Sequence, residues 1–195
     1  MALIPAIFLD KDGTVLVDEP YNVDPGRMAY ACGAREGLHL LAALNVPLIV
    51  ISNQPGVALG YFERRELAGV RDRLANMFLA AGARLAGFYW CPHHPQGSMT
   101  AYAGACACRK PRPGLLLQAA REHRVDLARS WLIGGILDDI EAGNRAGCRT
   151  VLLDVGNETE WRPGNWRRPS AQAVNWDQAA RHVAHAMRDA DREVE

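Results

Sequence analysis

Short apolar runs alternate with amphipathic segments along the whole chain, and this alternation limits the possible folds more than any other feature. Turn-forming residues bound each apolar run, which is typical of a buried strand. In the segments between, apolar residues recur about every 3.6 positions, which is typical of a helix packed on one side. The predicted strands are 6–9, 47–51, 87–90, 131–133 and 150–153, and the predicted helices are 34–44, 63–81, 113–123, 138–146 and 176–188.

Strand, helix and strand in repeated order predict an α/β fold, namely a three-layer, Rossmann-like parallel sheet with helices on both faces. Two stretches break the alternation: a loop insertion at 91–108 and an irregular loop at 156–170 that leads into the last helix. We expect residues 1–195 to form a single domain, which includes this insertion and the C-terminal loop and helix, 156–195. In such sheets ligands bind beyond the carboxyl ends of the strands, so functional residues are expected directly after the apolar runs.

Composition excludes several classes of protein. Of the 195 residues 49% are apolar and 23% are charged, which is typical of a globular chain rather than a disordered one. The 22 basic and 22 acidic residues balance, which argues against nucleic acid or an anionic membrane as a partner. No apolar run approaches the roughly 20 residues of a membrane-spanning helix, and the first residues lack the features of a secretory signal. We expect a cytoplasmic monomer whose partner is a small molecule.

Polar residues of particular types follow the predicted strands. Asp10 and Asp12 come after the first strand and could serve as nucleophile and proton-transfer group around a shared cation, although Asp-x-Asp-Gly is also an ordinary turn. Ser52 and its neighbour Asn53 come after the second strand and could hold phosphate oxygens. Lys110 precedes a later helix and is one of only two lysines among 22 basic residues. A compact ammonium there suits a phosphoryl group, whereas a solvated basic pair with Arg109 is the ordinary alternative.

Three of the five cysteines lie close together with histidine, which indicates a metal site. Cys91 and His93 form a Cys-x-His pair, and Cys106 and Cys108 form a Cys-x-Cys pair. Three thiolates and one imidazole suit tetrahedral zinc, and four protein ligands leave no open position, so the zinc is interpreted as structural. It would fix the loop and so orient the basic residues that follow it. Spacing alone permits His94 in place of His93, and free thiols in a flexible loop are the alternative.

Taken together, these motifs resemble those of the haloacid dehalogenase-type phosphatase superfamily. The shared features are Asp-x-Asp-Gly-Thr at 10–14, Ser-Asn at 52–53, the lysine at 110 and an acidic cluster after the fourth strand. The segments 5–10, 91–98 and 106–111 make the chain similar to D-glycero-D-manno-heptose 1,7-bisphosphate 7-phosphatases within it, over residues 5–153. The last 40 residues or so carry no motif that matches this family.

The resemblance implies a hydrolase of carbohydrate metabolism, linked to lipopolysaccharide, that removes the 7-phosphate of a heptose bisphosphate. Asp10 would form an aspartyl-phosphate, and Asp12 would donate and then accept a proton. Ser52 and Lys110 would surround the phosphoryl oxygens. The implied substrate-binding residues are Asp18, Tyr21, Asn53, Gln54, Arg109 and Lys110. The implied ligands are Asp10 and Asp12 for catalytic Mg²⁺, with Asp139 as an indirect one, and Cys91, His93, Cys106 and Cys108 for Zn²⁺.

One position departs from the family pattern. Gly135 stands where an aspartate that binds magnesium is expected, while Asp139 matches the second acid of that motif. Either this is a natural member with weak metal binding, or the chain is an altered form of an active enzyme. Two other functions stay open: a histidinol-phosphate phosphatase, and a catalytically weak or inactive homologue that binds a sugar phosphate. We expect the loop around Trp161 and Trp166 to cover a sheet edge rather than to close over the sugar.

Overall fold

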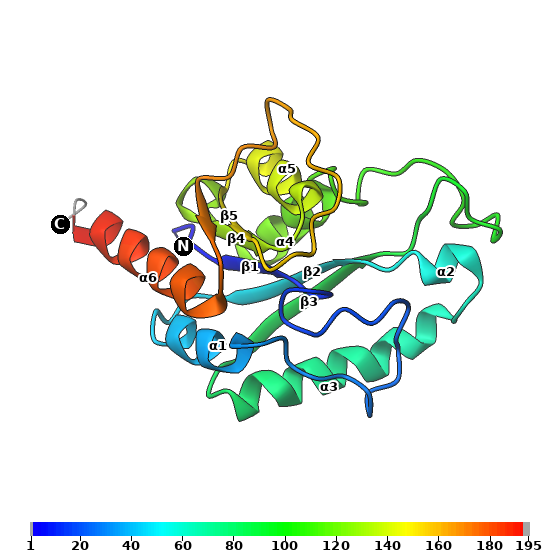
Figure 1. The fold of residues 1–195 in the computed structure, drawn as a ribbon, viewed down its shortest axis with the longest axis horizontal. Coiled ribbons are helices and arrows are strands. Elements are labelled where there is room, and N and C mark those ends of the chain that lie inside the picture. The colour runs from blue at the N-terminus through cyan, green and yellow to red at the C-terminus, as the bar shows by residue number, and fades with distance from the viewer. Residues whose placement is uncertain (1, 193–195) are drawn as a thin grey trace.

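The computed structural model describes residues 2–192 and contains one parallel sheet of six strands (Figure 1). The strand order is β3-β2-β1-β4-β5-β6, and every pairing is parallel. The strands are β1 (Ile7–Asp10), β2 (Leu48–Asn53), β3 (Leu85–Cys91), β4 (Trp131–Gly134), β5 (Arg149–Leu153) and β6 (Ala171–Ala173). The predicted parallel α/β sheet is confirmed.

Helices cover both faces of this sheet, as the three-layer prediction requires. In Figure 1, α4 and α5 lie on one side of the strands and α1, α3 and α6 on the other. The helices are α1 (Ala34–Ala42), α2 (Gly56–Leu59), α3 (Leu67–Ala80), α4 (Gly114–His123), α5 (Leu137–Ala146) and α6 (Trp176–Arg192), with short 3-10 turns η1 (Arg64–Glu66) and η2 (Leu127–Arg129). No helix among residues 2–192 is both long and apolar enough to cross a bilayer.

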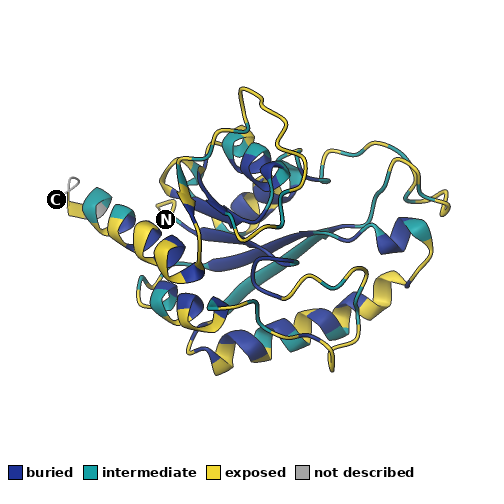
Figure 2. Ribbon diagram, viewed as in Figure 1, coloured by how far each residue is buried: buried dark blue, intermediate teal, exposed yellow. Residues whose placement is uncertain are grey.

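Two apolar layers form because side chains alternate across the central strands. Ile7 and Leu9 of β1 belong to the cluster that contains the helix residues Leu38, Leu74 and Val183. The intervening Phe8 belongs to the second cluster, which packs under α4 and α5. In Figure 2 the inner strands and the sheet-facing sides of the helices are buried, and exposed residues gather on the outer helix surfaces and the long loops.

Two short elements were not predicted, and one loop makes contacts with a helix that were not foreseen. α2 has four residues and β6 three, too few for a periodic pattern to be visible in the sequence. The loop that joins β5 to β6 packs on α5: the side-chain amide of Asn144 donates to the carbonyls of Trp166 and Arg168, and Arg167 pairs with Asp138 and Glu141. The loop also lines a cavity with Leu152 of β5 and Gln172 of the edge strand β6. It therefore packs on α5 as well as beside this edge of the sheet.

The last helix is fastened to the turn that follows β1. The indole Nε1 of Trp176 donates to the backbone carbonyl of Thr14 at 2.8 Å, and both residues are buried. An indole buried in an apolar layer needs such an acceptor, so the contact fixes α6 and the turn to each other. The turn carries the residues 10–14, whose geometry decides the site described next.

Candidate active site and metal centre

Three charged side chains meet at the carboxyl edge of the sheet. Asp10 ends β1, Asp139 lies in the first turn of α5, and Lys110 comes from the loop before α4. The Lys110 Nζ donates to Asp10 Oδ1 and to Asp139 Oδ1, each at 2.5 Å. In the sequence Asp10 and Asp139 follow different strands and Lys110 precedes a helix. The parallel sheet brings them together because its strand ends share one edge with the loops that follow them.

This cluster is largely closed to solvent, which strengthens its electrostatics. The side chains of Lys110 and Asp139 are 3% and 0% exposed. Burial works to lower the pKa of Lys110, but the two carboxylates outweigh it, and the pKa lies above the ordinary lysine range. Burial raises the pKa of Asp139, and the neighbouring Asp10 raises it further. Lys110 is therefore a permanent cation held against the proposed nucleophile.

Asp12 has a different environment from Asp10, although the two are separated by one residue. Its Oδ2 accepts hydrogen bonds from the Gln54 Nε2 at 3.1 Å and from the Ser52 hydroxyl at 3.4 Å. Its Oδ1 lies 2.8 Å from the ammonium of Lys11, a side chain that is 2% exposed. Burial raises the pKa of Asp12, and the charge of Lys11 opposes that rise. A carboxyl with a raised pKa, open on one side, suits a group that donates and accepts protons.

The remaining residues predicted for the substrate fall into two groups. Asn53 holds the Lys110 backbone at both ends, since its Oδ1 accepts from the Lys110 N–H at 3.0 Å and its Nδ2 donates to the Lys110 carbonyl at 3.2 Å. Gln54 is 4% exposed and turned toward Asp12. Three others lie further out: Asp18 lines a cavity of about 210 Å³ with Lys11 and Asp12, Tyr21 packs edge-on against Tyr61, and Arg109 donates to the carbonyl of His93.

The donors at this edge fit magnesium, with one carboxylate fewer than the resemblance led us to expect. Asp10 and the backbone carbonyl of Asp12 offer the oxygen ligands that Mg²⁺ prefers. Gly135, directly after β4, has no side chain to add. Asp139 is turned toward Lys110 and its other oxygen accepts from the backbone N–H of Ile136. Asp138 points away and pairs with Arg167.

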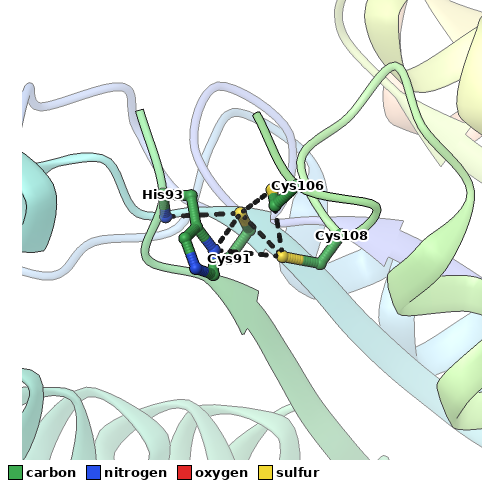
Figure 3. A group of neighbouring side chains, drawn as sticks. All are labelled: Cys91, His93, Cys106 and Cys108. Carbon is green, nitrogen blue, oxygen red and sulfur yellow. Dashed lines mark hydrogen bonds between the residues drawn. The ribbon is translucent and has the colours of Figure 1, made fainter. Parts of the chain in front are cut away.

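A second set of ligand-forming side chains lies where β3 ends (Figure 3). The Sγ atoms of Cys91, Cys106 and Cys108 and a ring nitrogen of His93 all lie within 4.8 Å of one another. The Sγ of Cys108 is 3.0 Å from that of Cys91 and 3.4 Å from His93 Nδ1. Thiolates around tetrahedral zinc are about 3.8 Å apart, given Zn–S bonds of about 2.3 Å. The three sulfur atoms lie 3.0, 3.3 and 3.5 Å from one another, so a small outward movement is enough for them to hold one ion.

The geometry selects between the two histidines that the spacing left open. His93 faces the three thiols, whereas His94 Nδ1 accepts from the backbone N–H of Gln96 and lies outside the set. The set is also coupled to the carboxylate cluster, because the backbone N–H of Arg109 donates to Cys106 Sγ at 3.3 Å and Lys110 is the next residue. Fixing the loop therefore fixes the ammonium.

Comparison with known proteins agrees with this geometry. Residues 107–190 match the model of a HAD-hydrolase-like family. The chain is 36% identical over 150 residues to the D-glycero-beta-D-manno-heptose-1,7-bisphosphate 7-phosphatase of Yersinia pestis, covering 77% of this chain and 80% of the relative. It is 34% identical over 174 residues to the enzyme of the same name from Escherichia coli K12, covering 89% and 87%. The chain belongs to the haloacid dehalogenase-like phosphatases.

Solved structures support the same family assignment. A HAD-like phosphatase from Mesorhizobium loti superposes with a TM-score of 0.83 at 27% identity, covering 97% of this chain and 88% of the other. The D,D-heptose 1,7-bisphosphate phosphatase of B. bronchiseptica, solved with magnesium and phosphate, superposes with a TM-score of 0.74 at 26% identity, covering 93% and 99%. The likeness extends over nearly the whole chain, including the C-terminal part for which the motifs gave no match.

Three residues of this phosphatase site were given no role from the sequence, although Lys11 and Thr14 lie within the motif at 10–14. Lys11 reaches Asp12, and Thr14 donates from its hydroxyl to Asp10 Oδ2 at 3.2 Å. Asn157, from the loop after β5, donates from Nδ2 to the Gly13 carbonyl at 2.6 Å. The rarity of lysine was a signal for Lys11, because both lysines of the chain are buried at this site. No sequence signal identified Asn157, which depends on how its loop folds back.

Proposed function

We propose that this phosphatase hydrolyses the 7-phosphate of D-glycero-D-manno-heptose 1,7-bisphosphate through an aspartyl-phosphate on Asp10, and that residues 1–195 act as one domain. The names of the relatives support the substrate. The observation that carries the mechanism is the placement of the Lys110 ammonium 2.5 Å from Asp10, with Asp12 nearby in a separate hydrogen-bonded setting. Two carboxyls with different environments suit two different roles.

In the first step a carboxylate oxygen of Asp10 attacks the phosphorus atom, and the bond from phosphorus to the C7 oxygen of the sugar breaks. The electron pair of that bond stays on the sugar oxygen, which takes the proton of the Asp12 carboxyl. The raised pKa of Asp12 keeps this proton available. In this proposal Lys110 and the hydroxyl of Ser52 stabilise the charge on the phosphoryl oxygens.

In the second step Asp12, now a carboxylate, takes a proton from water. The water oxygen attacks phosphorus, and the bond to Asp10 breaks, which releases inorganic phosphate and restores the Asp10 carboxylate. Gln54 supports both steps, because its hydrogen bonds to Asp12 Oδ2 and to the Ser52 hydroxyl hold the two groups in a fixed relation.

Two metal ions complete the proposal. Asp10 and the carbonyl of Asp12 would hold magnesium, which supplies positive charge that offsets the charge of the phosphoryl group. Cys91, His93, Cys106 and Cys108 would hold a structural zinc ion, which keeps Arg109 and Lys110 oriented toward the substrate. Arg109 would contact the hydroxyls or the second phosphate of the sugar.

A direct assay tests this function. Purified protein is incubated with Mg²⁺ and either anomer of the heptose 1,7-bisphosphate, and the products are identified by ³¹P NMR. We expect heptose 1-phosphate and inorganic phosphate, and a phosphoprotein that forms in wild type and is absent in Asp10→Asn. Histidinol phosphate serves as the competing substrate. Faster turnover of histidinol phosphate would contradict the proposed substrate, and no turnover of any phosphate ester would favour a binding role.

Gly135 adds a second expectation. Because an anionic ligand is missing, we expect the Mg²⁺ concentration that gives half-maximal activity to exceed that of Gly135→Asp by at least about tenfold. A titration of activity with Mg²⁺ measures both values under the same conditions. Equal values would mean that the missing negative charge does not limit the binding of Mg²⁺.

A further inference from the structure

The space beside Gly135 is filled by a side chain from another strand end. A Cβ atom built on Gly135 would lie 3.1 Å from Asn157 Nδ2, 3.3 Å from the Thr14 hydroxyl and 3.5 Å from the Gly13 carbonyl oxygen. A longer side chain at position 135 would extend into the same space. Asn157 follows β5, the neighbour of β4 in the sheet, so its amide reaches the β4 end from the adjacent loop.

Two hydrogen bonds fix the side-chain amide of Asn157 and the residue that follows it. The Asn157 Nδ2 donates to the Gly13 carbonyl at 2.6 Å. Gly13 has a φ of 74°, and a Cβ atom at this residue would lie only 2.7 Å from Nδ2, so a glycine here leaves the room that the amide needs. The next residue, Glu158, accepts through Oε2 from the Leu137 N–H at 2.6 Å, at the start of α5. The segment is thus attached to the turn after β1 and to the helix after β4.

Position 135 also lies near Asp10, the proposed magnesium ligand. Lys110 occupies Asp10 Oδ1, whereas Thr14 contacts the other oxygen, Oδ2, and the same Thr14 hydroxyl lies next to the Cβ position of Gly135. With Nδ2 committed to Gly13, the Oδ1 of Asn157 has no donor within residues 2–192 and is available as a ligand.

We propose that Asn157 supplies, through Oδ1, the protein oxygen that Gly135 cannot give to a divalent cation bound at Asp10. An amide oxygen is a hard, neutral ligand of the kind that Mg²⁺ and Ca²⁺ accept. The site would then keep its number of protein ligands but hold the cation with one negative charge fewer. This inference rests on the proposed function only in that both need a cation beside Asp10.

Metal binding without substrate tests the proposal. Protein freed of loosely bound divalent ions is titrated with Mn²⁺, and free Mn²⁺ is followed by electron paramagnetic resonance. We expect Asn157→Ala to raise the Kd for Mn²⁺ by at least about fivefold and Asn157→Asp to lower it by about tenfold. The matched control is Asn165→Ala, an exposed asparagine of the same loop, which should bind as wild type does. Unchanged affinity in Asn157→Ala would overturn the proposal.

A second measurement, of Tm with and without Mn²⁺, distinguishes a metal ligand at Asn157 from a residue that only stabilises its loop. If Asn157 only fastens its loop, Asn157→Ala lowers Tm by the same amount with and without Mn²⁺. If it is a ligand, the rise in Tm caused by Mn²⁺ becomes smaller in Asn157→Ala and larger in Asn157→Asp. Equal Mn²⁺-induced shifts in all three proteins would refute the ligand role.

The two positions should also be coupled. Because Asn157 occupies the space of a side chain at 135, the gain in Mn²⁺ affinity from Gly135→Asp should be greater in Asn157→Ala than in wild type. Equal gains in both backgrounds would contradict shared occupancy. Loss of the phosphatase proposal would appear differently, as normal Mn²⁺ binding in wild type without turnover of phosphate esters.

Discussion

The two clusters of possible metal ligands are built in opposite ways. The Cys/His set comes from residues 91–108 and contains all four donors of a closed site. The carboxylate cluster joins strand ends that are distant in sequence: Lys110 is 100 positions from Asp10 and 29 from Asp139. It also lacks the carboxylate expected at position 135. One cluster depends on its own loop, and the other depends on the whole sheet.

This difference bears on how each cluster responds to change. In the Cys/His set every ligand is a member of one small group, so a lost thiolate has no substitute nearby. At the sheet edge, several loops converge, and a neighbouring loop can fill the place of a missing side chain, as Asn157 does beside Gly135. Substitutions in the two clusters should therefore differ in size and kind.

The largest effect is expected at the nucleophile. Asp10→Asn keeps the shape of the side chain but removes the attacking carboxylate and one partner of Lys110. We expect kcat to fall by at least about a thousandfold, as is usual when a nucleophile is lost. Steady-state release of phosphate measures it. Zinc content should stay at the wild-type level, and its loss would show that the two clusters are not separable.

The next largest effect on kcat is expected when one zinc ligand of the Cys/His set is removed. Cys108→Ser replaces a thiolate by a poor zinc ligand, two residues before Lys110. We expect zinc to be lost and kcat to fall by about a hundredfold, because a displacement of about 1 Å at a catalytic group has that consequence. Metal analysis and phosphate release measure the two quantities. Cys32→Ser, at an exposed cysteine outside the set, is the control. Wild-type kcat in a zinc-free Cys108→Ser would mean that the loop does not orient the ammonium.

The sequence was most informative where neighbours along the chain decide the structure. The central strands and long helices follow from alternation and helical spacing, and the Cys/His set follows from two close pairs. The convergence of Asp10, Ser52 and Lys110 could be predicted as well, because parallel strands end at one edge. Asp10 and Ser52 were found from their positions at strand ends, and Lys110 from its position between the Cys/His loop and the next helix.

Contacts that depend on irregular loops were beyond the sequence. The path of the loop after β5 is set by Arg167, which pairs with Asp138 and Glu141, and by two carbonyls bound to Asn144. These contacts join positions with no periodic pattern, so neither the docking on α5 nor the approach of Asn157 to Gly135 was foreseen. Asp139 was expected to reach the metal indirectly, and its direct contact with Lys110 was missed for the same reason.

A smaller effect should separate the two carboxyls of the active site. Lys11→Met removes the ammonium that opposes the rise of the Asp12 pKa, while Asp10 keeps Lys110. Because Asp12 must be protonated for the first step, its pKa sets the alkaline limb of kcat/KM, which should move to higher pH by roughly one unit. The pH profile of kcat/KM, compared between wild type and Lys11→Met, measures the direction of the shift. Lys11→Arg, which keeps the charge, is the control, and a shift to lower pH would contradict the role.

The smallest effect concerns thiol counts and tests whether the Cys/His set is closed. With zinc bound, only the exposed Cys32 should react with a thiol reagent at pH 8, and after chelation the partly exposed Cys106 and Cys108 should react too. Cys91 and Cys148 should stay unreactive in both states, because they are 0% and 7% exposed and burial raises the pKa of both thiols. The expected change is from one thiol to three, measured by absorbance. Three or more reactive thiols before chelation would show that the set holds no metal, and the contrast with the sheet-edge cluster would fail.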